Sequence, residues 1–251
     1  MSENTASEPG LGDRPRGWGQ DQLTQFLEMA FHNRLATFDN IPEVRRVIAI
    51  DAVYMDVFVG KPWVNPGASI APTFFIRGHA AWRSAVEHAM SGQVAEVFAP
   101  GRLALEYAAY ALRICTQEEL AEVFLKRHDS EAALKACKSA FRAEKLVRAI
   151  GELDVPGADR FEKLYQRAVD YGAHPNERAI TGSLSIDDAA DPKALTLEQK
   201  QLHGEGPQLD HAIRTVCQIG MTCLDIFVLI FPDRFRDVGV MARLPNLRRG
   251  L

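Results

Sequence analysis

The last long helix that the sequence predicts is apolar on most of its sides, and it constrains the fold more than any other segment. It spans roughly 207–231, and apolar residues occupy most of its circumference from Ile213 to Phe231. Because such a helix has no polar face to turn toward water, it has to be surrounded by other helices. The sequence therefore predicts a helical bundle built around this segment.

Helical spacing of apolar residues continues through most of the remaining chain. The segment 20–38 carries apolar residues three and four positions apart, and a second helix is expected from Pro42 to about Phe58. Further helices are predicted over residues 73–90, 93–114, 116–127, 131–150 and 156–174. The stretch 179–192 is the one convincing non-helical segment, with room for a short strand. The fold class is therefore an all-α, multi-helix bundle of about seven or eight helices.

Two local patterns predict where helices begin. Thr116 followed three residues later by Glu119 matches a capping box, which predicts a helix start at Thr116. Asp129 and Ser130 are candidate N-caps for the helix expected over 131–150.

The predicted bundle forms a single domain over residues 20–232. Residues 1–19 are polar and rich in Gly and Pro, with no apolar stretch, so a disordered arm and no signal peptide are expected there. The last residues, 233–251, carry Arg243, Arg248 and Arg249 and are expected to form a basic C-terminal tail.

Net charge and cysteine usage narrow the class of protein. The formal net charge is −4, so no global field attracts nucleic acid, and any phosphate-binding site has to be a local patch. None of the four cysteines forms a C-x-x-C pair, which favours reduced, buried thiols in a reducing compartment. The most apolar run, Cys223–Phe231, is shorter than the ~20 residues of a membrane helix. A cytoplasmic protein without membrane association is expected.

A helix with positive charge ends near a histidine in the stretch FEKLYQRAVDYGAHPNER, residues 161–178. Gly172 suits a helix C-terminus and Pro175 disfavours helical geometry at His174, so His174 is expected just past the helix end. The negative end of the helix dipole would favour its protonated form. Arg167 could then hold a phosphate while His174 moves the proton of a ribose hydroxyl. Alternatively, Arg167 is a solvated or ion-paired side chain and His174 a capping residue.

The spacing R-x6-H, from Arg167 to His174, resembles the long form of the R-x4–6-H motif of the HEPN superfamily of helical domains. The stretches GRLALEYAAYALRI (101–114) and YQRAVDYGAHPN (165–176) are also similar to uncharacterised bacterial helical proteins of that kind. The resemblance covers roughly residues 73–230 and implies a HEPN-like helical core. Many HEPN members are metal-independent RNases in which Arg and His from two protomers line one composite site. The resemblance thus implies catalytic roles for Arg167 and His174, RNA as substrate and a homodimer.

Arg102 and Glu106 lie one helical turn apart on an otherwise apolar helix. If they are buried, they have to satisfy each other or a third group, because an unpaired buried charge is costly. Either Glu106 supports the site by orienting Arg102 or His174, or the pair forms a structural clamp between helices.

A row of basic residues follows helical spacing on the helix expected over 131–150. One face of that helix could then contact an RNA backbone, or it could simply be solvated. The RNA-binding candidates are Lys135, Lys138, Arg142 and Lys145, and Arg148 continues the row.

No motif in the sequence indicates a metal or a cofactor. The histidines are scattered without an H-E-x-x-H pattern, and there is no phosphate-binding loop after a strand. Two functions remain open: a metal-independent endoribonuclease, and a non-catalytic helical module that binds a protein or a small ligand.

Overall fold

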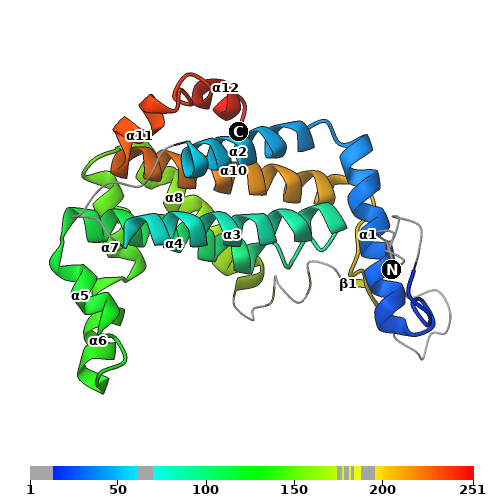
Figure 1. The fold of residues 1–251 in the computed structure, drawn as a ribbon. Helices are drawn as coiled ribbons and strands as arrows, with labels where there is room; N and C mark the ends of the chain where they lie inside the picture. Colours follow the sequence, from blue (N-terminus) through cyan, green and yellow to red (C-terminus); the bar gives the residue numbers. More distant parts are fainter. Residues whose placement is uncertain (1–13, 61–69, 174–176, 178–180, 182–183, 188–195) are drawn as a thin grey trace, which may run out of the picture.

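The structure, a computed structural model, describes residues 14–60, 70–173, 177, 181, 184–187 and 196–251. These residues fold almost entirely into helices, which confirms the all-α prediction (Figure 1). The α-helices are α1 (Gln22–Asn40), α2 (Val44–Val59), α3 (Ala71–Ser91), α4 (Phe98–Thr116), α5 (Glu119–Leu125), α6 (Glu131–Ala140), α7 (Ala143–Gly151), α8 (Val155–Ala168), α10 (Pro207–Ile230), α11 (Pro232–Asp237) and α12 (Leu244–Arg248).

Two smaller elements lie between α8 and α10. A wider helical turn, η2 (Val169–Ala173), continues α8, and β1 (Leu184–Asp187) pairs antiparallel with β2 (Thr196–Gln199). The strand β1 lies inside the stretch for which the sequence predicts a non-helical conformation. The described residues contain eleven α-helices, more than expected, because several are only one or two turns long.

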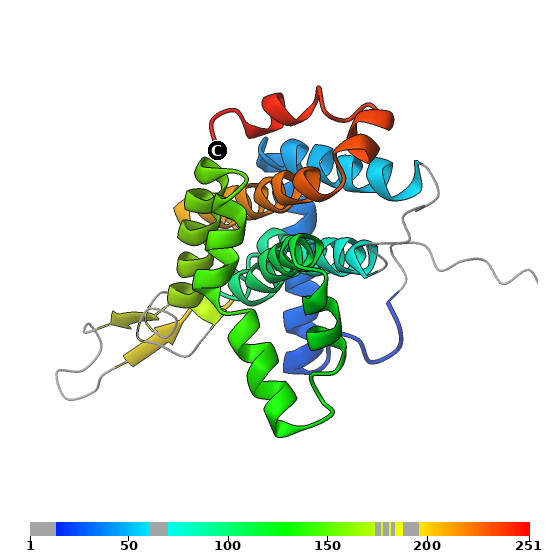
Figure 2. The same cartoon turned by 90° about the vertical axis from the view of Figure 1, so that its left-hand side faces the viewer.

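Helix α10 occupies the centre of the bundle, as its composition predicts. It packs against α2, α3, α4, α8, α11 and α12. In Figure 1, α2 and α10 form an upper layer over α3 and α4, while α1 crosses one end of the bundle. Figure 2 shows the α5–α6 hairpin projecting from the opposite side to α11 and α12.

A close approach between α3 and α10 fixes the core. The Trp82 indole donates a hydrogen bond to the Val216 carbonyl oxygen at 2.8 Å. A Cβ atom at Gly220 would lie 2.6 Å from the indole nitrogen of Trp82, so only glycine fits under this ring. The Tyr54 hydroxyl, also fully buried, donates to the Gly220 carbonyl oxygen at 3.3 Å.

Among the described helices, α10 alone is long and apolar enough to cross a membrane by length and composition. Buried residues make up 67% of its most apolar window, as in the core helix of a soluble protein. The whole helix thus exceeds the short apolar run that the sequence pattern singles out.

The prediction of a single helix over residues 131–150 is wrong. The chain breaks at Phe141 and Arg142, which separates α6 from α7. The Phe141 ring stacks on Tyr110 at 4.4 Å, and the guanidinium of Arg113 donates to the Ala140 carbonyl oxygen at 2.7 Å. These contacts from α4 satisfy the backbone where the helix opens, so the break is stabilised from outside the segment.

One of the two predicted helix starts is confirmed. The Ser130 hydroxyl caps α6 by accepting a hydrogen bond from the Ala133 backbone at 3.1 Å. The prediction of a helix start at Thr116 is wrong, because α4 continues through Thr116 and α5 begins at Glu119. The Thr116 hydroxyl instead donates back to the Arg113 carbonyl oxygen.

The basic C-terminal tail expected over 233–251 is folded. Phe235, Val240 and Leu244 are buried against the bundle. Arg234 donates to the Val57 carbonyl oxygen at 2.6 Å and to that of Phe58 at 3.1 Å, so it caps the end of α2. Apolar burial and this cap hold the segment in place.

The arm expected over 1–19 is described from Arg14 onward, while residues 1–13 lie outside the described ranges. Arg14 binds Glu28 on α1 at 2.7 Å, and the Trp18 indole donates to the same carboxylate at 2.6 Å. These hydrogen bonds, from Arg14 first, lower the pKa of Glu28 to about 2. Residues 14–19 are therefore docked on α1 rather than disordered.

The cysteines are free thiols, as predicted. Cys137, Cys217 and Cys223 are buried and Cys115 is half-buried. Burial raises the pKa of Cys217 and of Cys223 to about 12, which keeps both thiols protonated and unreactive.

Candidate functional site

Arg167 lies in the last turn of α8, and local sequence explains where this helix begins and ends. The Asp154 side chain caps the N-terminus by accepting from the Gly157 backbone at 3.0 Å. At the other end the chain widens into η2, where Gly172 leaves helical geometry. A Cβ atom at Gly172 would lie 2.6 Å from the Ala95 carbonyl oxygen, so this turn packs closely on the segment just before α4.

Arg167 points toward α10 and binds an amide rather than a carboxylate. Its guanidinium donates to the side-chain oxygen of Gln218 at 2.9 Å. Within the described ranges, no carboxylate lies within ion-pair distance of Arg167. The neutral partner orients the guanidinium without cancelling its charge, so Arg167 remains able to bind an anion.

A cavity of about 150 Å³ opens beside Arg167, where α8, α10 and the residues of α12 meet. Gln218, Met221 and Thr222 of α10 form part of its wall. We call this cavity the α8–α10 groove.

His174, the expected partner of Arg167, lies outside the described residues. A different histidine, His211, lies on α10 two helical turns before Gln218 and therefore on the same face of that helix. Burial lowers the pKa of His211, and the positive charges of Arg167 and Arg214 lower it further. His211 is thus within electrostatic range of Arg167 and is neutral at pH 7. The sequence holds no local signal for this proximity, since 44 residues separate the two positions.

Arg102 and Glu106 form a clamp between α4 and α8. Arg102 binds Glu106 at 2.9 Å and the Tyr165 hydroxyl at 2.9 Å, and that hydroxyl donates to Glu106 at 3.0 Å. Tyr165 and Arg167 are two residues apart, which is about 200° around the helix. The clamp and Arg167 therefore face different neighbours, so the structure does not bring Arg102 and Glu106 to the groove.

The basic residues expected on one face of a 131–150 helix belong to two helices. Lys135 and Lys138 lie on α6, Arg142 is the residue before α7, and Lys145 lies on α7. Because the chain turns between them, the four side chains do not form one helical stripe. Their role in RNA binding stays a prediction.

Sequence reasoning missed a cluster that joins α2 to α3. Arg83 binds Asp51 through two hydrogen bonds of 2.7 and 2.8 Å, and the His79 ring lies 2.7 Å from the same carboxylate. Tyr54 stacks on the His79 ring at 4.4 Å. Burial alone would raise the pKa of Asp51, but the bonds from His79 and Arg83 hold it well below the usual range. The spacing of His79 and Arg83 was visible in the sequence, whereas Asp51 lies 28 residues away.

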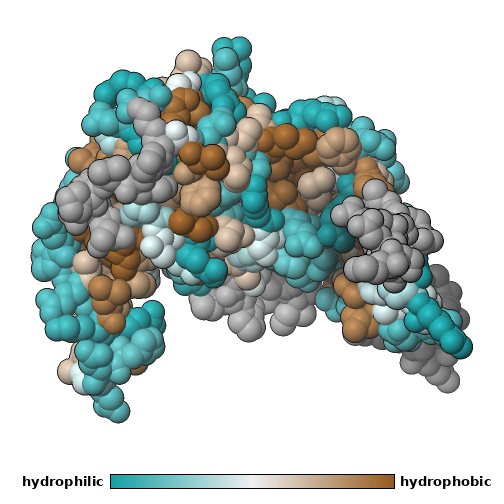
Figure 3. All heavy atoms as spheres, in the orientation of Figure 1, coloured by the Kyte–Doolittle hydropathy of each residue, from teal (hydrophilic) through white to brown (hydrophobic). Residues whose placement is uncertain are grey.

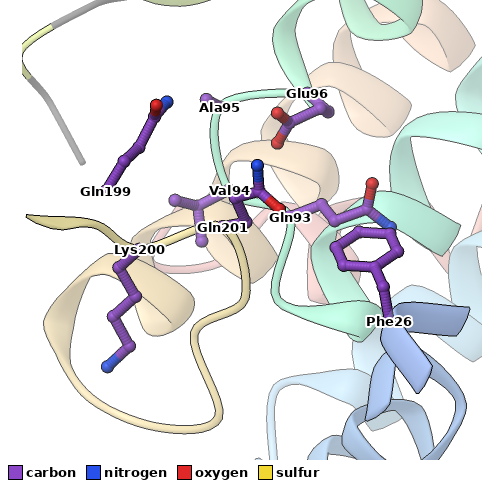
Figure 4. Close-up of a pocket in the computed structure, with 8 residues that line it drawn as sticks. All are labelled: Phe26, Gln93, Val94, Ala95, Glu96, Gln199, Lys200 and Gln201. Atoms are coloured by element: carbon purple, nitrogen blue, oxygen red, sulfur yellow. The ribbon is translucent and has the colours of Figure 1, made fainter. Parts of the chain in front are cut away.

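A second cavity, of about 220 Å³, lies where α1, the α3–α4 turn and the segment after β2 meet (Figure 4). Three of its eight lining residues are glutamines, and Glu96 points into it while Lys200 points away (Figure 4). A Cβ atom at Gly92, whose φ is +84°, would lie 2.2 Å from the His203 carbonyl oxygen. The cavity thus lies at a tightly packed junction without converging charges of one sign.

No group of three or more His, Cys, Asp or Glu side chains in the described part of the chain is arranged to hold a metal ion. No family model, no curated protein and no solved structure matches this chain.

Proposed function

We propose that the chain binds RNA in the α8–α10 groove and cleaves it there without a metal ion. The observation that carries the proposal is the Arg167 guanidinium, which lines a cavity and is held by the Gln218 amide at 2.9 Å. An arginine with its charge uncompensated and its orientation fixed suits a phosphodiester, which offers two anionic oxygens to a bidentate donor.

The reaction requires one proton acceptor near the bound phosphate. A histidine takes the proton of the ribose 2′-hydroxyl, and the 2′-oxygen attacks phosphorus. The bond to the 5′-oxygen breaks, and that oxygen leaves with a proton, which yields a 2′,3′-cyclic phosphate and a 5′-hydroxyl. The HEPN-like motif assigns the histidine role to His174, with Arg167 stabilising the charge on phosphorus. In HEPN RNases two protomers share the site, so a homodimer belongs to the proposal.

Cleavage of a mixed RNA pool in excess EDTA tests this function. Wild-type protein should cut, and Arg167→Ala and His174→Ala should each lower the rate by about 100-fold or more. Circular dichroism and melting curves have to show that both variants are folded like the wild type. A folded His174→Ala protein that still cuts RNA at the wild-type rate would exclude the Arg–His mechanism.

A non-catalytic binding module is the second candidate, and an exposed apolar face favours it. Helix α1 contacts mainly α3, and its side chains Leu23, Leu35 and Phe38 are exposed, as is Ile48 on α2. Hydrophobic surface is also visible over α2 in Figure 3. Apolar patches on helices often mark sites where proteins bind.

Charge substitutions at Leu35 separate the two candidates. If α1 is the functional surface, Leu35→Lys abolishes partner binding, while Arg167→Ala changes only stability. If the groove is the functional site, Leu35→Lys leaves RNA cleavage unchanged.

A further inference from the structure

The α8–α10 groove extends past Arg167, and its far end is lined by further cations. Lys163 and Arg160 come from α8, one and two turns before Arg167 respectively, and Arg248 comes from α12. Of the described residues that line the groove, Asp225 alone has an acidic side chain. The lining therefore carries more positive than negative charge, although the protein as a whole is acidic.

The carboxylate of Asp225 binds two of these arginines. Its side chain is 10% exposed, and it binds Arg248 and, at 3.5 Å, Arg160. One buried carboxylate thus holds guanidinium groups from two separate helices at the same wall. Such an arrangement fixes the donors before a ligand arrives, which lowers the cost of ordering them on binding.

Arg160 is held only loosely by the described part of the chain. Its Nε atom is buried and has no hydrogen-bond acceptor among the described residues. Its Nη2 atom reaches Asp154 at 3.4 Å and Asp225 at 3.5 Å, both at the long end for a hydrogen bond. Because both carboxylate contacts of Arg160 are long, an anion in the groove competes only with weak hydrogen bonds for this guanidinium.

The groove is small, with a volume of about 150 Å³ beside Arg167. Leu164 and Met221 form an apolar part of the wall, which strengthens the interaction between the cations and a bound anion by keeping water away.

We propose that the far end of the groove binds a phosphate monoester dianion. A monoester offers three oxygens and close to two negative charges at neutral pH, whereas a phosphodiester offers two oxygens and one charge. Three cations beside Arg167 suit the monoester. The identity of this monoester rests on the proposed function. It is the terminal phosphate of an RNA chain, and Arg167 binds a phosphodiester next to it. Inorganic phosphate shares the same chemistry and is the alternative source.

Binding of 2′-O-methyl oligonucleotides tests the proposal, because they lack the hydroxyl that cleavage requires. Oligonucleotides with a 5′-phosphate, with a 3′-phosphate and with neither are compared by fluorescence anisotropy in EDTA. One of the terminal phosphates should tighten binding about tenfold, and Lys163→Gln should remove most of that gain. Lys163 suits the test because its one described ion pair is with Asp159 on the same exposed helix face. Lys126→Gln, at an exposed lysine that binds Glu122 on α5, is the matched control and should change nothing.

The outcomes separate this inference from the proposed function. Equal binding of all three oligonucleotides overturns the monoester pocket, and the proposed function survives if Arg167→Gln still weakens all of them. Stabilisation of the protein by inorganic phosphate, lost in Lys163→Gln and in Arg248→Gln, supports the pocket. If no oligonucleotide then binds, RNA is excluded as the source and the proposed function fails with it.

Discussion

Two clusters of charged residues lie on different sides of α10, and they differ in how their charges are balanced. Between α2 and α3, the carboxylate of Asp51 accepts from His79 and from both ends of the Arg83 fork. In the α8–α10 groove, Arg167 has only an amide partner among the described residues. The first cluster satisfies itself, which is what a structural clamp requires. The second leaves positive charge facing a cavity, which is what a site for an anion requires.

The largest expected effect on stability comes from breaking the Asp51–His79–Arg83 cluster. Asp51→Ala removes the shared acceptor and leaves His79, whose side chain is 10% exposed, beside an unpaired Arg83. Because the carboxylate itself is partly exposed, we expect a loss of about 2 kcal/mol rather than the full cost of a broken buried pair. Urea denaturation measures it. An unchanged unfolding midpoint together with weakened RNA binding would reverse the roles of the two clusters.

Tyr165→Phe should have a smaller effect and lies on the same helix as Arg167. The substitution removes the hydroxyl that links Arg102 to Glu106, so we expect a loss of about 1 kcal/mol in unfolding free energy. RNA binding should stay at the wild-type level, since Tyr165 faces α4. A loss of binding as large as that of Arg167→Gln would show that the clamp of Arg102, Glu106 and Tyr165 belongs to the site.

The stability that the Asp51–His79–Arg83 cluster contributes also depends on pH, and the sign of this dependence follows from the pKa of Asp51. The folded pKa of Asp51 lies below the ordinary value of 3.8, so its contribution to stability is present above that value and is lost as the pH falls through the folded pKa. Wild type should therefore exceed Asp51→Asn in stability near pH 7, and the gap should close in acid. Melting temperatures of both proteins, from pH 7 down to the lowest pH at which they stay folded, measure this gap, which should begin to narrow below pH 3.8. A gap that widens in acid would contradict the assigned ionic clamp.

The smallest expected effect is on the salt dependence of RNA binding. Removing one phosphate contact by Arg167→Gln should reduce the slope of log K against log salt by about 0.7 for single-stranded RNA. The pair Lys135→Gln and Lys138→Gln tests whether α6 also contacts RNA. An unchanged slope in that double variant would restrict the contacts to the groove.

Periodicity in the sequence was enough to predict the central helix and the all-α class. The range expected for α10, roughly 207–231, agrees with Pro207–Ile230, because one helix that is apolar all round has a single stable environment. The N-cap role of Ser130 was also predicted correctly, because capping depends on residues within one turn.

Features that depend on distant contacts could not be predicted. The break at Phe141 requires Tyr110 and Arg113 from α4, and nothing within 131–150 indicates it. The folded C-terminus did have a local signal, the apolar residues Phe235, Val240 and Leu244, which the neighbouring arginines obscured. For the site, Arg167 was chosen from its motif, but its partner Gln218 is 51 residues away and became apparent only in the fold.

One paired measurement tests the central claim that the unbalanced groove, rather than the balanced clamp, is the ligand site. RNA binding is measured by fluorescence anisotropy at low salt and in EDTA for wild type, Arg167→Gln and Arg83→Gln, which make the same change in the two clusters. The account predicts that Arg167→Gln weakens binding about tenfold while Arg83→Gln binds like the wild type. Equal weakening in both variants, or weakening in Arg83→Gln alone, would contradict it.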